Sequence, residues 1–271
     1  MHQTRPAAVA GSFYPAQAQL LASDVRSLLA HAGAGLPSNA TPPKAVVVPH
    51  AGYVYSGAMA ARAYACLAPA RAAIRRVVLL GPVHRVPVRG LALPGVGFFA
   101  TPLGNVAIDA RAIASIRHLP QVVVSPAAHA QEHALEVQLP FLQSVLDAFT
   151  LVPLAVGDAS AEEVAEVLET LWGGPETLIV VSSDLSHFLP YAMAQSADRD
   201  TVQRILRLDG PLNHEQACGG TPINGLLLAA ARHHLRAELL GLCNSGDTAG
   251  DKRRVVGYAS VAFHAEVGHA R

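Results

Sequence analysis

The chain has 271 residues, of which 51% are hydrophobic and 15% charged, and its 20 basic and 20 acidic residues give a formal net charge of +0 at pH 7. This composition predicts a globular protein with ample apolar material for a core. A balanced charge argues against nucleic acid and anionic membrane surfaces as partners, because phosphate groups attract clustered basic charge. No apolar run reaches the roughly 18 residues that a membrane span needs.

Two further features of the sequence predict a cytoplasmic protein. The first residues, MHQTRPAAVAGSFYP, lack the basic and then apolar layout of a secretory signal. The cysteines Cys66, Cys218 and Cys243 are too few and too scattered for a disulfide framework, which fits a reducing compartment. The unusual count is 13 histidines against 3 methionines. Because histidine is the commonest metal ligand in proteins, the positions of the histidines indicate whether the chain has a metal site.

Short β-branched runs alternate with helix-like stretches along the chain, a pattern typical of layered α/β proteins. The runs are almost continuously apolar, as expected for strands that are buried on both faces. The predicted strands are residues 45–48, 77–80, 151–156 and 178–181. The predicted helices are residues 17–32, 57–67, 132–148, 161–172, 192–208 and 222–234.

Two remaining segments complete the predicted fold. Residues 85–105 are rich in proline and glycine, which predicts either a surface loop or a small hairpin. Residues 237–242 and 255–264 predict a closing hairpin at the edge of the sheet. No segment reads as a linker, so we expect one domain over residues 1–271, an αβα sandwich with a mostly parallel or mixed sheet.

Three of the predicted strands are followed by side chains that can bind metals. His50 follows the first, His84 follows the second, and both Asp184 and His187 follow the fourth. A single histidine after a strand is more often a solvated loop residue or a satisfied core residue. However, ligand sites of open α/β sheets form outside the carboxyl ends of the strands. Three such positions in one chain therefore predict a shared site.

The chemistry of this site depends on its anionic ligand. Imidazoles with one carboxylate suit non-haem iron(II), whereas a thiolate shifts the preference towards zinc or copper. Asp184 is one candidate, and Cys218 in the segment ACGGTPING is another. A free cysteine is most often a small buried hydrophobic residue, but a glycine-rich loop before a helix can also expose a reactive thiolate. The residues alone leave both alternatives open.

The segment AHAQEHALEVQLPFL adds a possible acid and base. It predicts a helix that begins with Glu132 and His133, with Glu136 on the same face. Beside a metal, such a pair can shuttle protons or orient a ligand. The alternative is an ordinary solvated helix face.

The motifs VAGSFYP, PHAGYVYSG, LLGPVH, EHALEVQLPFL, SSDLSH and CGGTPI, in this order and at these spacings, resemble the Memo family from about residue 5 to about residue 264. Bacterial members of this family are called AmmeMemoRadiSam system protein B. The family is similar in fold to the catalytic subunit of class III extradiol dioxygenases, which are non-haem iron enzymes. The resemblance implies that His50, His84 and Cys218 are metal ligands and that Asp184 and His187 border the same pocket. Cys218 departs from the two-histidine, one-glutamate site of the dioxygenases.

We therefore expect a metal-dependent redox enzyme that acts on an unknown small molecule. Iron is the expected metal, with copper or zinc as alternatives. His187, Asp184 and His133 are the expected catalytic residues, and His187 or His133 would move protons. One alternative is a non-catalytic protein that binds a metal, a peptide or a partner, since the family name implies an association with an AMMECR-type protein and a radical-SAM enzyme. Another is metal-assisted hydrolysis.

Overall fold

The computed structural model describes residues 3–34 and 41–265. Its centre is a parallel sheet whose four strands are almost entirely buried and apolar, as strands covered on both faces must be. In spatial order these strands are β2 (Ala45–Val48), β9 (Thr177–Ser182), β3 (Arg76–Pro82) and β8 (Thr150–Val156). All four carboxyl ends therefore lie at one edge of the sheet.

Antiparallel strands extend this sheet on both sides. On the β2 side, β12 (Val255–Ala265) pairs with β2, and β10 (His187–Leu189) and β11 (Leu235–Asn244) both pair with β12. On the other side, β4 (Leu91–Leu93) is antiparallel to β8 and parallel to β7 (Val122–Val124). A separate small sheet contains β1 (Thr4–Arg5), β5 (Phe98–Thr101) and β6 (Gly104–Ala107).

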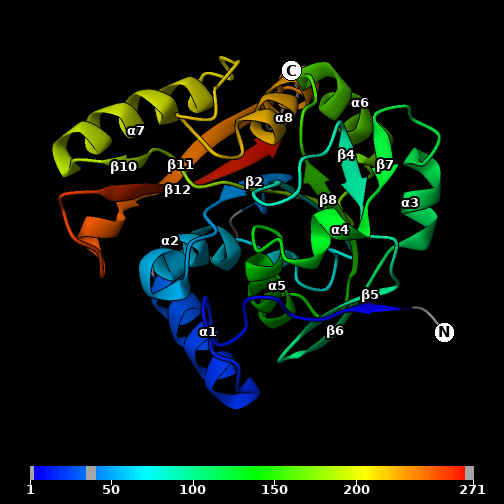
Figure 1. Cartoon of the computed structure of the whole chain (residues 1–271), viewed down its shortest axis with the longest axis horizontal. Helices are drawn as coiled ribbons and strands as arrows, with labels where there is room; N and C mark the ends of the chain where they lie inside the picture. The colour runs from blue at the N-terminus through cyan, green and yellow to red at the C-terminus, as the bar shows by residue number, and fades with distance from the viewer. Residues whose placement is uncertain (1–2, 35–40, 266–271) are drawn as a thin grey trace.

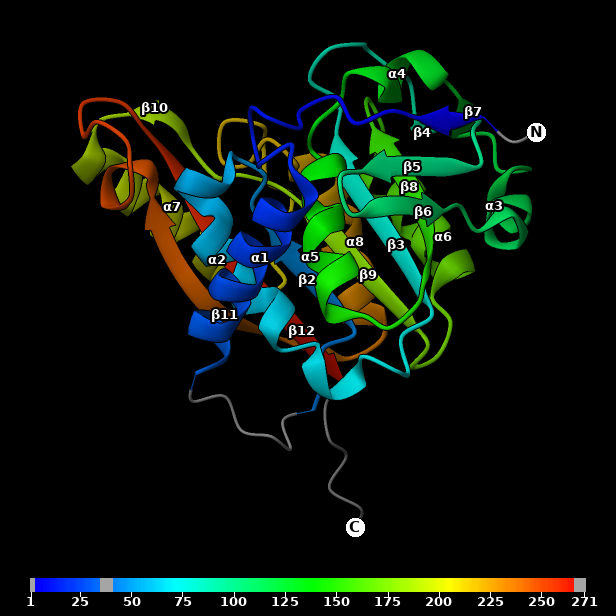
Figure 2. The ribbon, with the colours of Figure 1, turned by 90° about the horizontal axis from the view of Figure 1, so that it is seen from below.

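Helices cover both faces of the main sheet (Figures 1 and 2). Val46 and Val48 pack into one core, and Ala45 and Val47 pack into a second core on the opposite face. The first core is closed by α1 (Ala18–Gly33), α2 (Tyr53–Ala65) and α5 (Leu139–Val145). The second is closed by α3 (Ala110–Ile116), α6 (Ala161–Leu171), α7 (Tyr191–Leu206) and α8 (Gly220–Arg232). No helix in residues 3–34 and 41–265 combines the length and hydrophobicity that crossing a membrane requires.

The predicted α/β class, with helices on both faces of a mixed sheet, is confirmed. Each predicted strand lies inside one of the four central strands of the structure. The segment 85–105 contains β4 and runs into the hairpin of β5 and β6. The predicted closing hairpin is formed by β11 and β12, but only β11 lies at the edge, because β12 also pairs with β2.

The predicted helix over residues 132–148 is wrong. The chain there forms the short helix α4 (Pro126–Ala130), an irregular segment, a 3₁₀ turn (Glu136–Gln138) and then α5. The reason is that the buried carboxylate of Glu132 accepts hydrogen bonds from the backbone N–H groups of His133 and Ala134, which holds the chain out of a helix. Glu132, His133 and Glu136 consequently share no helix face.

Candidate metal centre

Two histidines meet at the carboxyl ends of the central strands. His50 is the second residue after β2, and His84 is the second residue after β3. Because β9 lies between these two strands, the two side chains reach towards each other across its end. The centroids of their rings are 5.2 Å apart. The strand-end argument thus predicted this juxtaposition.

A third histidine, His133, joins them from the irregular segment after α4. Its ring centroid is 5.4 Å from that of His50 and 4.7 Å from that of His84. Each of the three side chains offers a nitrogen, and these nitrogens lie within 4.8 Å of one another, which makes a group that could hold a metal ion. His50 is buried, His133 is half-buried and His84 is exposed, so the group opens to solvent on the His84 side.

The hydrogen bonds of His50 define which of its nitrogens is free. Its Nδ1 is 2.9 Å from the hydroxyl of Ser182. That hydroxyl donates its only proton to the carbonyl of Ala134 at 2.6 Å, and it also accepts from Gln138 Nε2 at 2.8 Å. It must therefore accept from His50, which places the proton on Nδ1 and a lone pair on Nε2. Burial, followed by the nearby His84, lowers the pKa of His50 to about 3, which favours the neutral form that binds metals.

Glu132 orients His84 in a similar way. Its carboxylate accepts from the backbone N–H of His84 at 2.6 Å and from Nδ1 of the ring at 2.9 Å. Burial alone would raise the pKa of Glu132, but the hydrogen bonds from His84 and from the backbone lower it to about 2. An ionised carboxylate that accepts the Nδ1 proton leaves Nε2 of His84 free. This carboxylate–histidine arrangement is typical of metal ligands.

The same carboxylate lies beside His133. Glu132 Oε1 is 3.4 Å from Nδ1 of His133, and the ring of Phe13 packs against the imidazole with 4.7 Å between centroids. Burial, and then the nearby His50, lowers the pKa of His133 to about 4. His133 is thus a neutral imidazole at neutral pH, available either as a further ligand or as a proton acceptor.

Cys218 approaches the group from the loop before α8. Its sulfur is 3.3 Å from Nε2 of His50, and two ligands of one tetrahedral zinc ion would be about 3.5 Å apart, given typical bond lengths. Burial, and then Asp184, raises the pKa of this thiol to about 12, so it is protonated until a cation compensates its charge. A Cβ on Gly219 would lie 2.7 Å from the Cβ of Ser183, so glycine lets the loop pass the end of β9.

Residues 5–262 match the family model described as Memo-like protein. The chain belongs to the Memo family. It is 36% identical to a MEMO1 family protein of Ignicoccus hospitalis and 37% identical to one of Methanopyrus kandleri, and each alignment covers 96% of this chain and 98% of the relative. A solved structure of an uncharacterised Escherichia coli K12 protein covers 80% of this chain and 98% of its own, with 14% identity and a TM-score of 0.47.

The other two expected site residues of this Memo-family chain lie beside the group rather than in it. Asp184 Oδ1 accepts from the backbone N–H of His50 at 2.7 Å, and burial raises the pKa of Asp184. His187, at the start of β10, donates from Nδ1 to the carbonyl of Leu185 at 2.9 Å if the proton is on that nitrogen, which leaves Nε2 as an acceptor. As a smaller cause than burial, the nearby His187 lowers the pKa of both His50 and Asp184.

Sequence reasoning missed the residues that hold His50 in place. Ser182 and Gln138 are both buried, and Gln138 Nε2 also donates to the carbonyl of Pro49 at 2.9 Å. The hydroxyl of Tyr64 donates to Gln138 Oε1 at 2.9 Å and completes this network. The signal that the sequence offers for Ser182 is its position directly after the apolar run 178–181 and close to Asp184.

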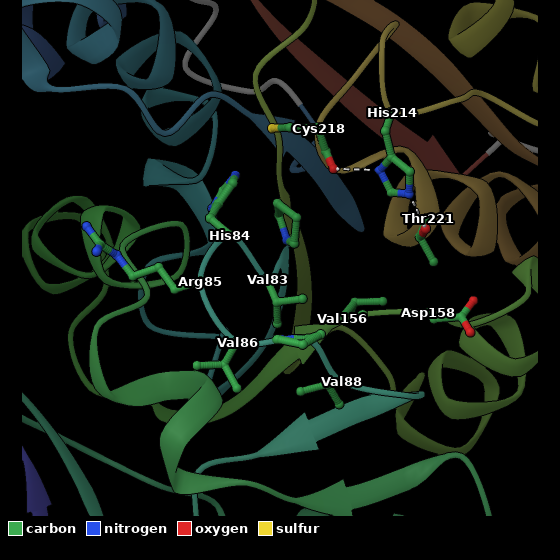
Figure 3. A pocket seen from close by; sticks show the side chains of 13 residues that line it. Val83, His84, Arg85, Val86, Val88, Val156, Asp158, His214, Cys218 and Thr221 are labelled. Carbon is green, nitrogen blue, oxygen red and sulfur yellow. Dashed lines mark hydrogen bonds between the residues drawn. The ribbon is translucent and has the colours of Figure 1, made fainter.

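A pocket of about 640 Å³ adjoins the metal-binding group (Figure 3). His84, Cys218, Asp158, His214 and Thr221 contribute to its wall, and Asp158 and Thr221 lie on the side opposite His84. Its apolar lining includes the four valines Val83, Val86, Val88 and Val156. His214 is itself held in place, because its Nδ1 is 3.2 Å from the carbonyl of Cys218.

Proposed function

We propose that this Memo-family protein is a metal-dependent redox enzyme that acts on a small molecule. In this proposal His50, His84 and Cys218 bind one transition metal ion, and His133 lies beside them. The observation that carries it is the group of three histidine nitrogens within 4.8 Å of one another, in which buried acceptors bind Nδ1 of both His50 and His84, with the sulfur of Cys218 3.3 Å from Nε2 of His50. We propose iron as the metal; copper and zinc suit the same nitrogen and sulfur donors.

The pocket beside the group supports an enzymatic function. Its volume of about 640 Å³ is within the range of small-molecule sites, and its four valines suit the apolar body of a substrate. A metal bound at its wall would supply one-electron chemistry and the activation of dioxygen. When Nδ1 of His187 donates to Leu185, its Nε2 is left as a proton acceptor, which is the role of a general base.

Location and partners form part of the same proposal. A cytoplasmic location is supported by the three cysteines, which are all free thiols in the structure. An AMMECR-type protein and a radical-SAM enzyme are proposed as partners on the strength of the bacterial family name.

The test is metal analysis combined with turnover. Protein purified without oxygen and reconstituted with iron(II) should hold one equivalent of metal, and it should consume dioxygen with a member of a catechol panel. His84→Ala should lose both properties. His118→Ala, which changes an exposed histidine outside the group, is the matched control and should keep both. Absence of bound metal, or dioxygen consumption that survives His84→Ala, would refute the proposal.

A further inference from the structure

The segment Arg5–Tyr14, here called the N-terminal strap, crosses the segment His129–Glu136, here called the histidine loop. Figure 2 shows the strap in dark blue between β1 and α1. Arg5 is only 4% exposed and directs its guanidinium at the loop. Its Nε donates to the carbonyl of His129 at 2.7 Å, and its Nη2 donates to the carbonyl of Glu132 at 2.6 Å. A single buried side chain thus joins two carbonyls of the histidine loop.

Glu136 binds the strap from the other direction. Its side chain is 0% exposed and accepts from Arg5 Nη1 at 2.6 Å. It also accepts from the backbone N–H groups of Ala8 at 2.7 Å and Val9 at 3.0 Å, and from the hydroxyl of Tyr14 at 2.5 Å. Four donors therefore surround this carboxylate, so the desolvated ion pair is fully satisfied by hydrogen bonds.

These bonds bear on the metal-binding group through Glu132. The backbone of Glu132 is held by Arg5, while its side chain holds His84 and, through a backbone bond at 2.9 Å, His133. The loop has no regular helix at Glu132 or His133, so hydrogen bonds within a helix do not fix these residues. The strap also places the ring of Phe13 against His133. The bonds from the strap therefore add to the few hydrogen bonds that the loop makes within itself, in place of the regular bonds of a helix.

We propose that Arg5 and Glu136 are positioning residues of the metal centre. They act through Glu132 and His133 and touch neither metal nor substrate. This inference rests on the proposed metal binding, and it assigns a function to the VAGSFYP motif, which the proposed chemistry leaves unused. A purely structural ion pair would change the stability of the protein without changing the properties of the site in the folded molecules.

The variants that test this inference are Arg5→Lys and Glu136→Gln. Arg5→Lys keeps the charge but cannot form the three-way arrangement of the guanidinium. The matched controls are Arg71→Lys and Asp147→Asn, which alter an exposed ion pair with a 2.8 Å contact. Three quantities are measured for each folded variant: amide hydrogen exchange of residues 129–136 in metal-free protein, the dissociation constant of added cobalt(II), and the visible spectrum of the bound cobalt(II).

For Arg5→Lys we expect faster amide exchange in the histidine loop and unchanged exchange in β3. The cobalt(II) spectrum should change, and cobalt(II) binding should be about 10- to 100-fold weaker, as for other residues that orient metal ligands. Wild-type cobalt(II) affinity and spectrum in the variant would overturn the inference, whether or not loop exchange rises. If Arg5→Lys and Glu136→Gln do not fold, Tyr14→Phe removes a single donor to Glu136 and should change all three quantities in the same direction.

The two proposals fail in different ways. A wild-type chain that binds no metal overturns the proposed function. Wild-type binding that Arg5→Lys leaves unchanged overturns only the role of the strap.

Discussion

Replacing Glu132 by glutamine is the most informative single change near the metal centre. The carboxylate is 1% exposed and accepts four hydrogen bonds, from N and Nδ1 of His84 and from the backbone N–H groups of His133 and Ala134. Three of these donors share Oε1. Glutamine can keep its carbonyl oxygen there, but its NH₂ group then faces the N–H of His84.

The structure gives the size of the effect. The part-buried N–H of His84 loses its acceptor, which costs up to about 1–3 kcal/mol, and the other three bonds lose their ionic character. The pKa of Glu132 gives a similar figure, because a drop from 4.5 to about 2, achieved despite burial, corresponds to about 3 kcal/mol of preference for the ionised form. We therefore expect Glu132→Gln to lower the free energy of unfolding by about 3 kcal/mol at pH 7. Metal affinity should fall about 10- to 100-fold, because His84 loses its orienting carboxylate.

The assay is urea unfolding of metal-free protein, with zinc or cobalt(II) titration of the folded variant. Glu169→Gln is the matched control, because Glu169 also binds a histidine, His233, at 2.7 Å but is 34% exposed and outside the group. Its loss should stay below about 1 kcal/mol and leave the metal affinity unchanged. The reasoning is refuted if Glu132→Gln matches wild type in both measurements, or if the control loses as much as it does.

Three other changes test separate parts of the account. Ser182→Ala removes the acceptor of the Nδ1 proton of His50 and should weaken zinc binding about 10-fold in a titration, since the tautomer is no longer imposed. Gly219→Ala should cost about 1–3 kcal/mol in urea unfolding, because its Cβ would lie 2.7 Å from that of Ser183. Burial lowers the pKa of His129 from 6.5 to about 4, so the unfolded chain takes up a proton that the fold resists. The free energy of unfolding therefore carries no penalty from His129 above pH 6.5, and it falls by up to about 3 kcal/mol for this one group as the pH decreases to 4. Urea unfolding at the two pH values should show a smaller loss for His129→Gln than for wild type.

Each of these three predictions has a control variant or an outcome that would contradict it. Ser144→Ala removes a hydroxyl that only donates to the carbonyl of Pro140, and it should leave zinc binding unaltered. Gly33→Ala introduces a Cβ whose nearest neighbour, Ala65, is 3.9 Å away, and it should be nearly neutral. An acid-induced loss that is the same in His129→Gln and in wild type would contradict the assignment to His129.

The central sheet was predictable because its information is local. Runs such as residues 178–181 are apolar throughout and bounded by polar residues, so length and composition identify them as buried strands. The histidine loop was not predictable in this way. Its sequence carries helix-forming residues, but Glu132 is bound by His84 and Glu136 by Arg5, 48 and 131 positions earlier in the chain, and contacts at such separations leave no local pattern.

The residues of the candidate site likewise divide into those that local sequence patterns predict and those that depend on distant contacts. His50 and His84 were placed together by the topology of parallel strands alone, which requires only that each strand be recognised. The sulfur of Cys218 was expected at the site on the family resemblance, and it lies 3.3 Å from His50. The proximity of His133 depends on the irregular loop, and the roles of Ser182 and Gln138 depend on proton positions that only the hydrogen-bond network defines.

The central claim is that two histidines and Cys218 bind one metal ion. X-ray absorption spectroscopy of zinc-loaded protein tests it most directly, because nitrogen and sulfur ligands differ in distance and scattering. The account predicts imidazole nitrogens at about 2.0 Å and one sulfur at about 2.3 Å, with the sulfur absent from Cys218→Ser. A wild-type spectrum without sulfur, identical to that of Cys218→Ser, would contradict the claim.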